Sequence, residues 1–176
     1  MAKVLILVPT YNQKREYLLE CLKSIKNQTF KDFRCCILDD GSQNREETEA
    51  LAKEYKFDYV WQENEGIGSI RNLGIKQIKD ENFLCYISSD DSLELDYIQV
   101  MYNAAQEYPD TILYSNYYLM DENLNIIQQT NYVNYDIYED FVMAVVESAK
   151  KNQMFVNYNL FAPVKLLQDC LFNPDK

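Results

Sequence analysis

The sequence predicts an α/β fold with a Rossmann-like, mainly parallel sheet flanked by helices, and with a small antiparallel extension in the C-terminal half. Short, continuous apolar runs, which are typical of buried parallel strands, alternate along residues 4–108 with segments whose apolar residues recur at helical spacing. Repeated strand–helix units of this length imply parallel pairing through right-handed crossovers. After residue 110 the pattern changes to two extended runs around a turn.

Strands and helices alternate in the first part of the chain. The expected strands are residues 4–8, 33–38, 59–61 and 83–87. The expected helices follow them at 18–25, 46–55, 70–78 and 98–105. In the second part, the predicted elements are a hairpin of residues 111–120 and 126–130, a helix at 136–151 and a last strand at 154–161. We expect the hairpin to extend the sheet rather than form a separate module, and the whole chain, residues 1–176, to form one domain.

Composition bounds the class of protein. The 176 residues are 47% hydrophobic, which is enough to bury a full core. The net charge of −11 argues against nucleic acid and against an anionic membrane surface as partners, because both carry negative charge. The first apolar run ends at Pro9, and no run is long enough for a signal peptide or a transmembrane segment, so we expect a cytoplasmic protein.

Cysteine and histidine content excludes several chemistries. The five cysteines lie inside apolar segments without CxxC spacing, which predicts reduced core residues. They are Cys21, Cys35, Cys36, Cys85 and Cys170. The chain has no histidine, which excludes Ser-His-Asp and Cys-His nucleophilic schemes as well as histidine-ligated zinc.

Two aspartate doublets, Asp39-Asp40 and Asp90-Asp91, follow two of the predicted buried strands. In open α/β sheets, ligands bind in the crevice outside the carboxyl ends of parallel strands. Four acids that converge there would repel one another without a cation. The doublets therefore indicate a site for a metal or a cation-bridged ligand.

Four motifs follow the four predicted strands and leave the same edge of the sheet. They are Val8-Pro9-Thr10-Tyr11-Asn12, Leu38-Asp39-Asp40-Gly41-Ser42, residues 64–74 and Ser88-Ser89-Asp90-Asp91. In this order and at this spacing, they resemble the N-terminal, nucleotide-sugar-binding part of inverting glycosyltransferases of family 2, which have the GT-A fold. The resemblance is good over residues 3–108 and weak beyond them.

The resemblance implies a glycosyltransferase of the hexosyltransferase type. Such enzymes transfer a sugar with inversion from a nucleoside diphosphate donor, usually a UDP-sugar, to a hydroxyl group of a glycan or other acceptor, with Mn²⁺ or Mg²⁺ holding the diphosphate. Residues 1–108 would form the nucleotide-sugar-binding part and residues 109–176 a partial acceptor-side part. The implied role is polysaccharide or surface-glycan synthesis, in the cytoplasm or, for a full-length protein, at the inner face of the membrane.

The family's motifs also imply site residues. The implied nucleotide-binding residues are Pro9, Thr10, Tyr11, Asp40, Arg71 and Asp90, and the implied metal ligands are Asp90 and Asp91. Tyr11 offers an aromatic face to a base, and Asp40 offers an acceptor for the imide N–H of uracil. Arg71 matches the arginine that the family places near the nucleotide and its diphosphate.

Each of these residues also has a purely structural interpretation. Tyr11 is one of fifteen tyrosines, and an acid before a glycine, such as Asp40, often only shapes a turn. Arg71 is also expected on an exposed helix face, paired with a carboxylate. The carboxylates within reach are Glu65, Asp80 and Glu81. Residues 90–92 also suit the cap of the following helix.

The catalytic residue is the missing part of the pattern. Ser88 stands at the first position of the family's common Asp-x-Asp-Asp form, so the metal motif is a partial match. The family's base is a carboxylate of the acceptor half, often in a Glu-Asp pair, and it is unknown here. Residues 159–175 resemble the segment just upstream of that pair, so we expect a truncated chain that binds UDP with a metal and turns over poorly.

Two other functions fit parts of the pattern. A nucleotidyltransferase needs a glycine- and arginine-rich first loop with a lysine, and residues 9–15 do not match one. A phospho-acceptor or other nucleotide-binding Rossmann-like domain also places acids and Mg²⁺ at strand ends. It requires an isolated acceptor aspartate at a middle strand and a lysine at the end of a later strand, and none of the strands predicted in the tyrosine- and asparagine-rich C-terminal part ends in a lysine.

Overall fold

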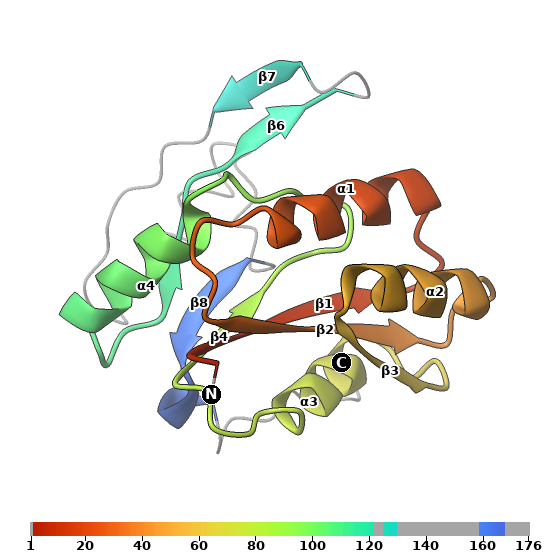
Figure 1. Ribbon diagram of the computed structural model, residues 1–176, viewed down its shortest axis with the longest axis horizontal. Helices are drawn as coiled ribbons and strands as arrows, with labels where there is room; N and C mark the ends of the chain where they lie inside the picture. Colours follow the sequence, from red (N-terminus) through yellow and green to blue (C-terminus); the bar gives the residue numbers. More distant parts are fainter. Residues whose placement is uncertain (1, 122–124, 130–158, 168–176) are drawn as a thin grey trace, which may run out of the picture. The chain divides into compact units, whose positions relative to one another are not determined.

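Residues 2–121, 125–129 and 159–167 are described by the computed structural model (Figure 1). They belong to two units, which we describe separately: residues 1–113 with 158–176, and residues 114–157. The predicted helix at 136–151 and most of the predicted strand at 154–161 lie outside the described residues.

The first unit contains the predicted alternation of strands and helices. Its strands are β1 (Val4–Thr10), β2 (Phe33–Asp40), β3 (Asp58–Gln62), β4 (Phe83–Tyr86) and β8 (Leu160–Pro163). Its helices are α1 (Arg15–Lys26), α2 (Arg45–Tyr55), α3 (Ile67–Ile75), α4 (Tyr97–Glu107) and the short 3-10 helix η1 (Val164–Leu166). The four strands and four helices expected before residue 108 are therefore confirmed. Within the described residues, no helix has the length and apolar character needed to span a membrane.

The strand order of the main sheet reverses at β1. The order is β3-β2-β1-β4-β8, with the two-residue β5 (Leu113–Tyr114) beyond β8. β1 pairs in parallel with both β2 and β4, β2 pairs in parallel with β3, and β8 is antiparallel to β4. The chain moves from β1 outward to β3 and then returns to the other side of β1. This arrangement confirms the predicted mainly parallel sheet, and ligands bind at such switch points.

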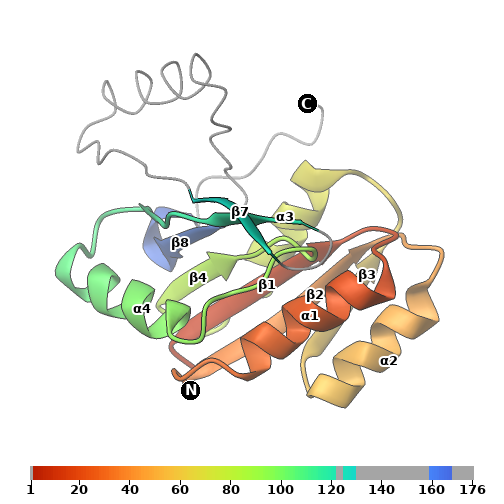
Figure 2. The same ribbon diagram turned by 90° about the horizontal axis from the view of Figure 1, so that it is seen from above.

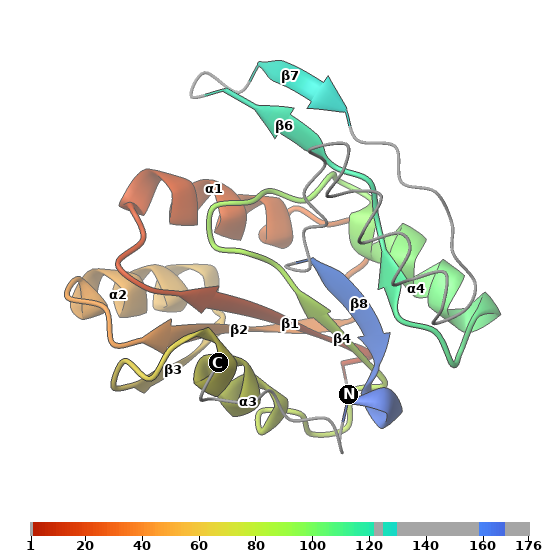
Figure 3. The same ribbon diagram turned by 180° about the vertical axis from the view of Figure 1, so that it is seen from behind.

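Successive side chains of the buried strands pack against opposite helical layers, with α1 and α2 on one side of the sheet and α3 on the other (Figures 2 and 3). Ile6 and Ile37 belong to a core shared with α1, α2 and α4, whereas Leu7 and Leu38 belong to a core shared with α3 and the segment after β8. All four side chains are fully buried. Burial on both faces explains why these strands are continuously apolar.

Helix α3 packs closely on the sheet because of Gly74. A Cβ atom at this position would lie 2.7 Å from a methyl carbon of Leu7 and 2.7 Å from one of Leu38. Any larger residue would therefore force these leucine side chains or the helix to shift.

Four of the predicted core cysteines are confirmed as buried free thiols: Cys21, Cys35, Cys36 and Cys85. Burial is the main reason why the pKa of Cys36 is raised to about 12, which leaves this thiol protonated and unreactive at neutral pH. Cys170 lies outside the described residues.

The amino edge of the sheet, where the parallel strands begin, carries a buried ion pair. The guanidinium of Arg34 donates hydrogen bonds to Glu81 (2.7 Å), to Asp58 (2.8 Å) and to the carbonyl oxygen of Gln77 (2.5 Å). Only 4% of the Glu81 side chain is exposed, against 51% of Asp58. The Arg34–Glu81 pair therefore lies in an environment of low dielectric.

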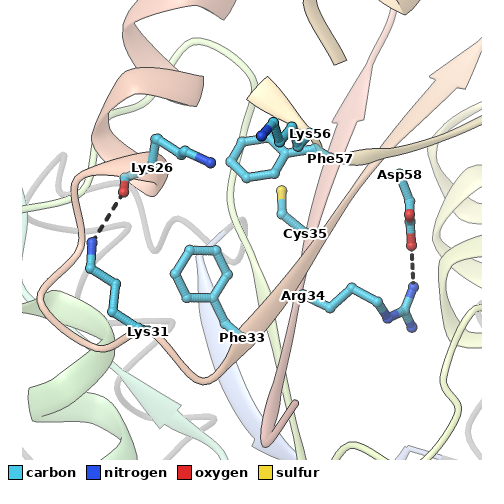
Figure 4. A pocket seen from close by; sticks show the side chains of 8 residues that line it. All are labelled: Lys26, Lys31, Phe33, Arg34, Cys35, Lys56, Phe57 and Asp58. Atoms are coloured by element: carbon cyan, nitrogen blue, oxygen red, sulfur yellow. Dashed lines mark hydrogen bonds and ion pairs between the residues drawn. The ribbon is translucent and has the colours of Figure 1, made fainter. Parts of the chain in front are cut away.

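A cavity of about 320 Å³ opens at the same edge (Figure 4). Its lining residues are Lys26, Lys31, Phe33, Arg34, Cys35, Lys56, Phe57 and Asp58. Two of its lysines bind main-chain carbonyls at helix ends: Lys26 donates to Tyr55 (3.1 Å) and Lys31 donates to Lys26 (3.3 Å). Cations stabilise helix C-termini in this way, which gives Lys26 and Lys31 a structural role.

The second unit contains the predicted hairpin. β6 (Tyr118–Met120) and β7 (Ile126–Gln129) pair in antiparallel fashion and form a two-stranded sheet of their own, where we expected an extension of the main sheet. The antiparallel strand of the main sheet is instead β8. The apolar pattern predicted that the last strand ends at Phe161, whereas β8 ends at Pro163. A proline is tolerated at this position because the end of a strand does not require its missing N–H group.

Candidate functional site

The predicted motifs meet at the carboxyl edge of the sheet. β1 and β2 pair in register up to Thr10 and Asp39, and β4 runs parallel to β1 on its other side. The exits of β1, β2 and β4 are therefore neighbours. Both aspartate doublets lie on this edge, at the point where the strand order reverses.

Asp39 has a structural role. Its carboxylate is fully buried and accepts hydrogen bonds from the Tyr59 hydroxyl (2.6 Å) and the Ser42 main-chain N–H (2.8 Å). Burial is the main reason why the pKa of Tyr59 is raised, and the hydrogen bond to Asp39 raises it further. The expectation that all four acids converge on a cation therefore does not hold for Asp39, which already has its partners.

Asp40 lies on the opposite face and organises the turn before α3. It is 5% exposed, and it accepts hydrogen bonds from the Gln62 amide (2.6 Å), from Glu65 N–H (3.1 Å) and from Gly66 N–H (2.9 Å). A carboxylate has about four acceptor positions, and Oδ1 already accepts two of these three bonds. The remaining position is on Oδ2, so a ligand N–H would have to approach that oxygen.

Gly41 allows the loop after β2 to approach the loop between β3 and α3. Its φ of +83° is in the left-handed region, and a Cβ atom would lie 2.6 Å from the main-chain nitrogen of Asn64. The loop that Gly41 approaches so closely is the β3–α3 loop. Both features restrict the position to glycine.

The loop after β1 carries the predicted base-binding residues. Pro9 is partly buried in β1, the Tyr11 side chain is 54% exposed, and Thr10 is 4% exposed. The hydroxyl group of Thr10 has no hydrogen-bond partner among the described residues. A buried polar group without a partner is rare in folded proteins and requires an explanation, such as a ligand that is not present.

Asn12 holds this loop in its conformation. Its φ of +49° is unusual for a residue other than glycine. The Asn12 N–H donates to the Ser42 hydroxyl (2.9 Å), and its side-chain oxygen accepts from Gln43 N–H (2.7 Å). The loops after β1 and β2 are therefore joined, which fixes the position at which Tyr11 is exposed.

Arg71 lies on α3 and is partly buried. Its carbonyl oxygen accepts a hydrogen bond from the Tyr86 hydroxyl (2.8 Å), and its guanidinium carbon lies 5.9 Å from the centre of the Tyr86 ring. Of the carboxylates considered as its structural partners, Glu81 is bound to Arg34 instead. The helix that carries Arg71 begins at the turn organised by Asp40.

The second doublet follows β4. Asp90 is exposed and accepts a hydrogen bond from the Ser88 hydroxyl (2.6 Å). Asp91 is partly buried and accepts a hydrogen bond from the amide of Asn159 (3.0 Å). Burial is the main reason why the pKa of Asp91 is raised; the bond from Asn159 opposes this shift, and the charge of Asp90 adds to it.

Asp90 and Asp91 offer the oxygen ligands that a hard divalent cation takes. The described part of the chain contains no group of three acidic or sulfur side chains that could hold a metal by themselves. Mg²⁺ and Mn²⁺ prefer oxygen ligands, and Mg²⁺ commonly combines one or two carboxylates with phosphate oxygens. Asp90 and Asp91 would therefore hold such a cation together with a bound diphosphate.

Sequence reasoning missed several residues that build the site. Tyr59 and Gln62 bind the first doublet, Gln13 donates to the Ser89 hydroxyl (3.2 Å), and Asn159 binds Asp91. Tyr59 lies in the predicted strand 59–61, and nothing in that short apolar pattern indicates that its hydroxyl group binds Asp39. Asn159 lies 68 positions from Asp91, so no local pattern relates the two.

The parallel sheet, its switch point at β1 and the acidic pair after β4 are features of the GT-A fold. Comparison with known proteins agrees with this class. The sequence profile of glycosyl transferase family 2 matches residues 5–161, so the chain belongs to this family.

Proteins with similar sequences are also named as glycosyltransferases. The chain is 33% identical over 126 residues to the glycosyltransferase GlyA of Streptococcus pneumoniae, with 69% of this chain and 18% of GlyA covered. It is 36% identical over 115 residues to the putative glycosyltransferase EpsH of Bacillus subtilis, with 62% of this chain and 32% of EpsH covered. The chain thus spans a third or less of these relatives.

A solved structure shares the fold. S. aureus TarS 1-349 superimposes with a TM-score of 0.73 at 20% sequence identity, covering 98% of this chain and 51% of that chain. The same protein has also been solved in complex with UDP and with UDP-GlcNAc, with TM-scores of 0.71 and 0.69. At this identity the likeness concerns the fold alone.

Proposed function

We propose that this chain is the donor-binding part of an inverting glycosyltransferase that uses a UDP-sugar and a divalent cation, and that transfers the sugar to a hydroxyl group of a growing polysaccharide or surface glycan. Family membership supports glycosyl transfer. The choice of UDP is supported by TarS, which shares the fold and has been solved with UDP and UDP-GlcNAc.

The observation that carries the proposal is the arrangement of three strand exits. Tyr11 directly follows β1, and Asp40 is the last residue of β2. Asp90 and Asp91 follow β4, on the other side of β1. Neighbouring strands are about 4.8 Å apart, so β2 and β4, which lie on either side of β1, are about 10 Å apart across the sheet. This separation suits a ligand whose base lies at one end and whose diphosphate lies at the other.

Each residue then has a proposed role. The exposed ring of Tyr11 stacks on the base, and Oδ2 of Asp40 accepts the imide N–H of uracil. Asp90 and Asp91 hold Mn²⁺ or Mg²⁺, and Arg71 lies near the diphosphate. A cation held by these carboxylates would neutralise the negative charge that develops on the departing nucleotide.

Transfer with inversion is a single displacement. The acceptor oxygen bonds to the anomeric carbon of the sugar, the bond between that carbon and the diphosphate oxygen breaks, and a base takes the proton of the acceptor hydroxyl. We assign this base to none of the described residues. The proposed contribution of the described residues is therefore to bind and orient the donor.

The phospho-acceptor alternative fits the structure less well. It requires an isolated aspartate with an accessible oxygen at a strand exit, and the exposed Asp90 directly adjoins Asp91. Asp39 is fully buried with two hydrogen-bond partners, and Asp40 is 5% exposed with three. An incoming phosphoryl group would have to displace these partners.

Calorimetric titration of UDP, with and without Mn²⁺, tests the proposal. We expect Mn²⁺ to increase UDP affinity at least tenfold in the wild type and to have little effect in Asp91→Ala. Asp80→Ala is the matched control, because Asp80 is an exposed carboxylate just before β4, at the amino edge. Failure of the wild type to bind UDP in the presence of Mn²⁺ would refute the proposal.

A further inference from the structure

Asn159 connects the acidic doublet to a distant part of the chain. It directly precedes β8, which returns to the sheet after residues 114–157 and pairs with β4. Its side-chain oxygen accepts a hydrogen bond from the Ser88 main-chain N–H (3.2 Å), and its amide donates to Oδ2 of Asp91 (3.0 Å). Both ends of the amide are therefore bound to the segment that follows β4.

The chemistry of these two contacts specifies an amide. One partner is a donor and the other is a carboxylate, so the side chain must accept at one atom and donate at the other. An aspartate would place an oxygen against Asp91, and a leucine of similar size would satisfy neither partner. The pairing also sets the orientation of the Asp91 carboxylate, because Oδ2 accepts the hydrogen bond from the Asn159 amide.

We propose that Asn159 is a positioning residue that orients Asp91 for binding of the divalent cation, so that the cation site is complete only when β8 has joined the sheet. This inference rests on the proposed function of the doublet. Residues that hold a metal ligand through a hydrogen bond affect metal affinity because they restrict the ligand to its binding orientation. The donor site is therefore not contained within residues 1–108.

A second bridge in the same region provides a matched control. The Ser24 hydroxyl donates to the Cys21 carbonyl oxygen (2.7 Å) and accepts from the Leu93 N–H (3.0 Å), so it ties α1 to the loop that follows the doublet. Like Asn159, it contributes two hydrogen bonds, and one of them holds the loop after β4. Unlike Asn159, it does not touch Asp91.

The test measures Mn²⁺ binding to the full chain with saturating UDP, by electron paramagnetic resonance of free Mn²⁺. In Asn159→Ala we expect Mn²⁺ affinity to fall by about 10- to 100-fold, the range for residues that support metal ligands. Asn159→Leu, which keeps most of the side-chain volume, should lose as much. Ser24→Ala should stay within about twofold of the wild type, and UDP affinity without metal should be the same in all four proteins.

The outcomes separate the inference from the proposed function. Wild-type Mn²⁺ affinity in both folded Asn159 variants overturns the positioning role while the proposed function stands. An equal loss in Ser24→Ala also overturns it, because general loosening of the loop would then explain the effect. If the wild type binds UDP yet no Mn²⁺, the cation site and the role of Asn159 are both wrong.

Discussion

Replacing Arg34 with methionine is expected to destabilise the protein by leaving a carboxylate buried without its partner. Methionine retains most of the apolar side chain of Arg34 and removes the guanidinium that binds Glu81 at 2.7 Å. The Glu81 side chain is 4% exposed, so water cannot replace the lost partner without a rearrangement. Asp58, the other acidic partner of Arg34, is 51% exposed and stays hydrated when the guanidinium is removed.

The magnitude follows from these exposures. Breaking a buried ion pair by removing one member costs about 3–5 kcal/mol. Arg34 is itself 19% exposed, which places the expected loss of unfolding free energy near the lower limit, at about 3 kcal/mol. An exposed pair gives a contrast: Arg15 and Glu47 are 52% and 44% exposed, and Arg15→Met should cost less than about 1 kcal/mol.

The effect should depend on pH. Burial opposes ionisation of Glu81, yet the bond from Arg34 and main-chain N–H groups outweigh it, so its pKa in the folded protein is lowered. Its stabilising contribution is therefore present above the unfolded pKa of about 4.3 and is lost as pH falls through the lowered folded pKa. In Arg34→Met, burial remains without the guanidinium, and the pKa of Glu81 should rise. The stability difference should then be largest near neutral pH and should shrink below about pH 4.

Urea unfolding followed by circular dichroism, at neutral and acidic pH, measures this difference. Adding Glu81→Gln to Arg34→Met should recover part of the loss, because an uncharged amide is less costly to bury. UDP affinity should be unchanged, since the pair lies at the amino edge of the sheet. A neutral-pH loss below about 1 kcal/mol, or a loss of equal size at every pH, would refute the reasoning.

Three further predictions concern the site and the helix that frames it. Gly74→Ala should lower the unfolding free energy by about 1–3 kcal/mol in urea titrations, because the new methyl group lies 2.7 Å from side-chain carbons of two strands; an unchanged midpoint would contradict the close packing of α3. Gly41→Ala should weaken UDP binding in calorimetry, because a Cβ atom at this position would lie only 2.6 Å from the main-chain nitrogen of Asn64 and would force the loop next to Asp40 to move. Full UDP affinity would show that this close contact is not needed for binding. Tyr11→Ala should weaken UDP binding by about 1–3 kcal/mol and Tyr11→Phe should not, because stacking needs the ring alone; equal loss in both would indicate a role for the hydroxyl.

Several features could be predicted because they depend on local patterns. Continuous apolar runs marked the buried strands, and their alternation with helical periodicity indicated parallel pairing. Parallel pairing in turn placed the residues after each run on one edge of the sheet. Both aspartate doublets were assigned to the correct edge on this basis.

The different roles of Asp39 and Asp40 depend on the tertiary structure. Side chains alternate along β2, so Asp39 follows Ile37 toward α1 and α2, while Asp40 follows Leu38 toward α3. The alternation itself is visible in the sequence. Which helix covers which face, and therefore which partners each carboxylate meets, is decided only when the elements pack.

The amino-acid sequence by itself determined the α/β class, the order of the first eight elements and the set of polar residues carried to the strand exits, because these follow from periodicity and chain connectivity. Tertiary structure alone decided that Tyr59 binds Asp39, that Gln62 and the turn before α3 bind Asp40, and that β8 delivers Asn159 to Asp91. Hydrogen bonds between residues far apart in the chain depend on which side chains the packed elements bring within about 3 Å, and no local pattern encodes that distance.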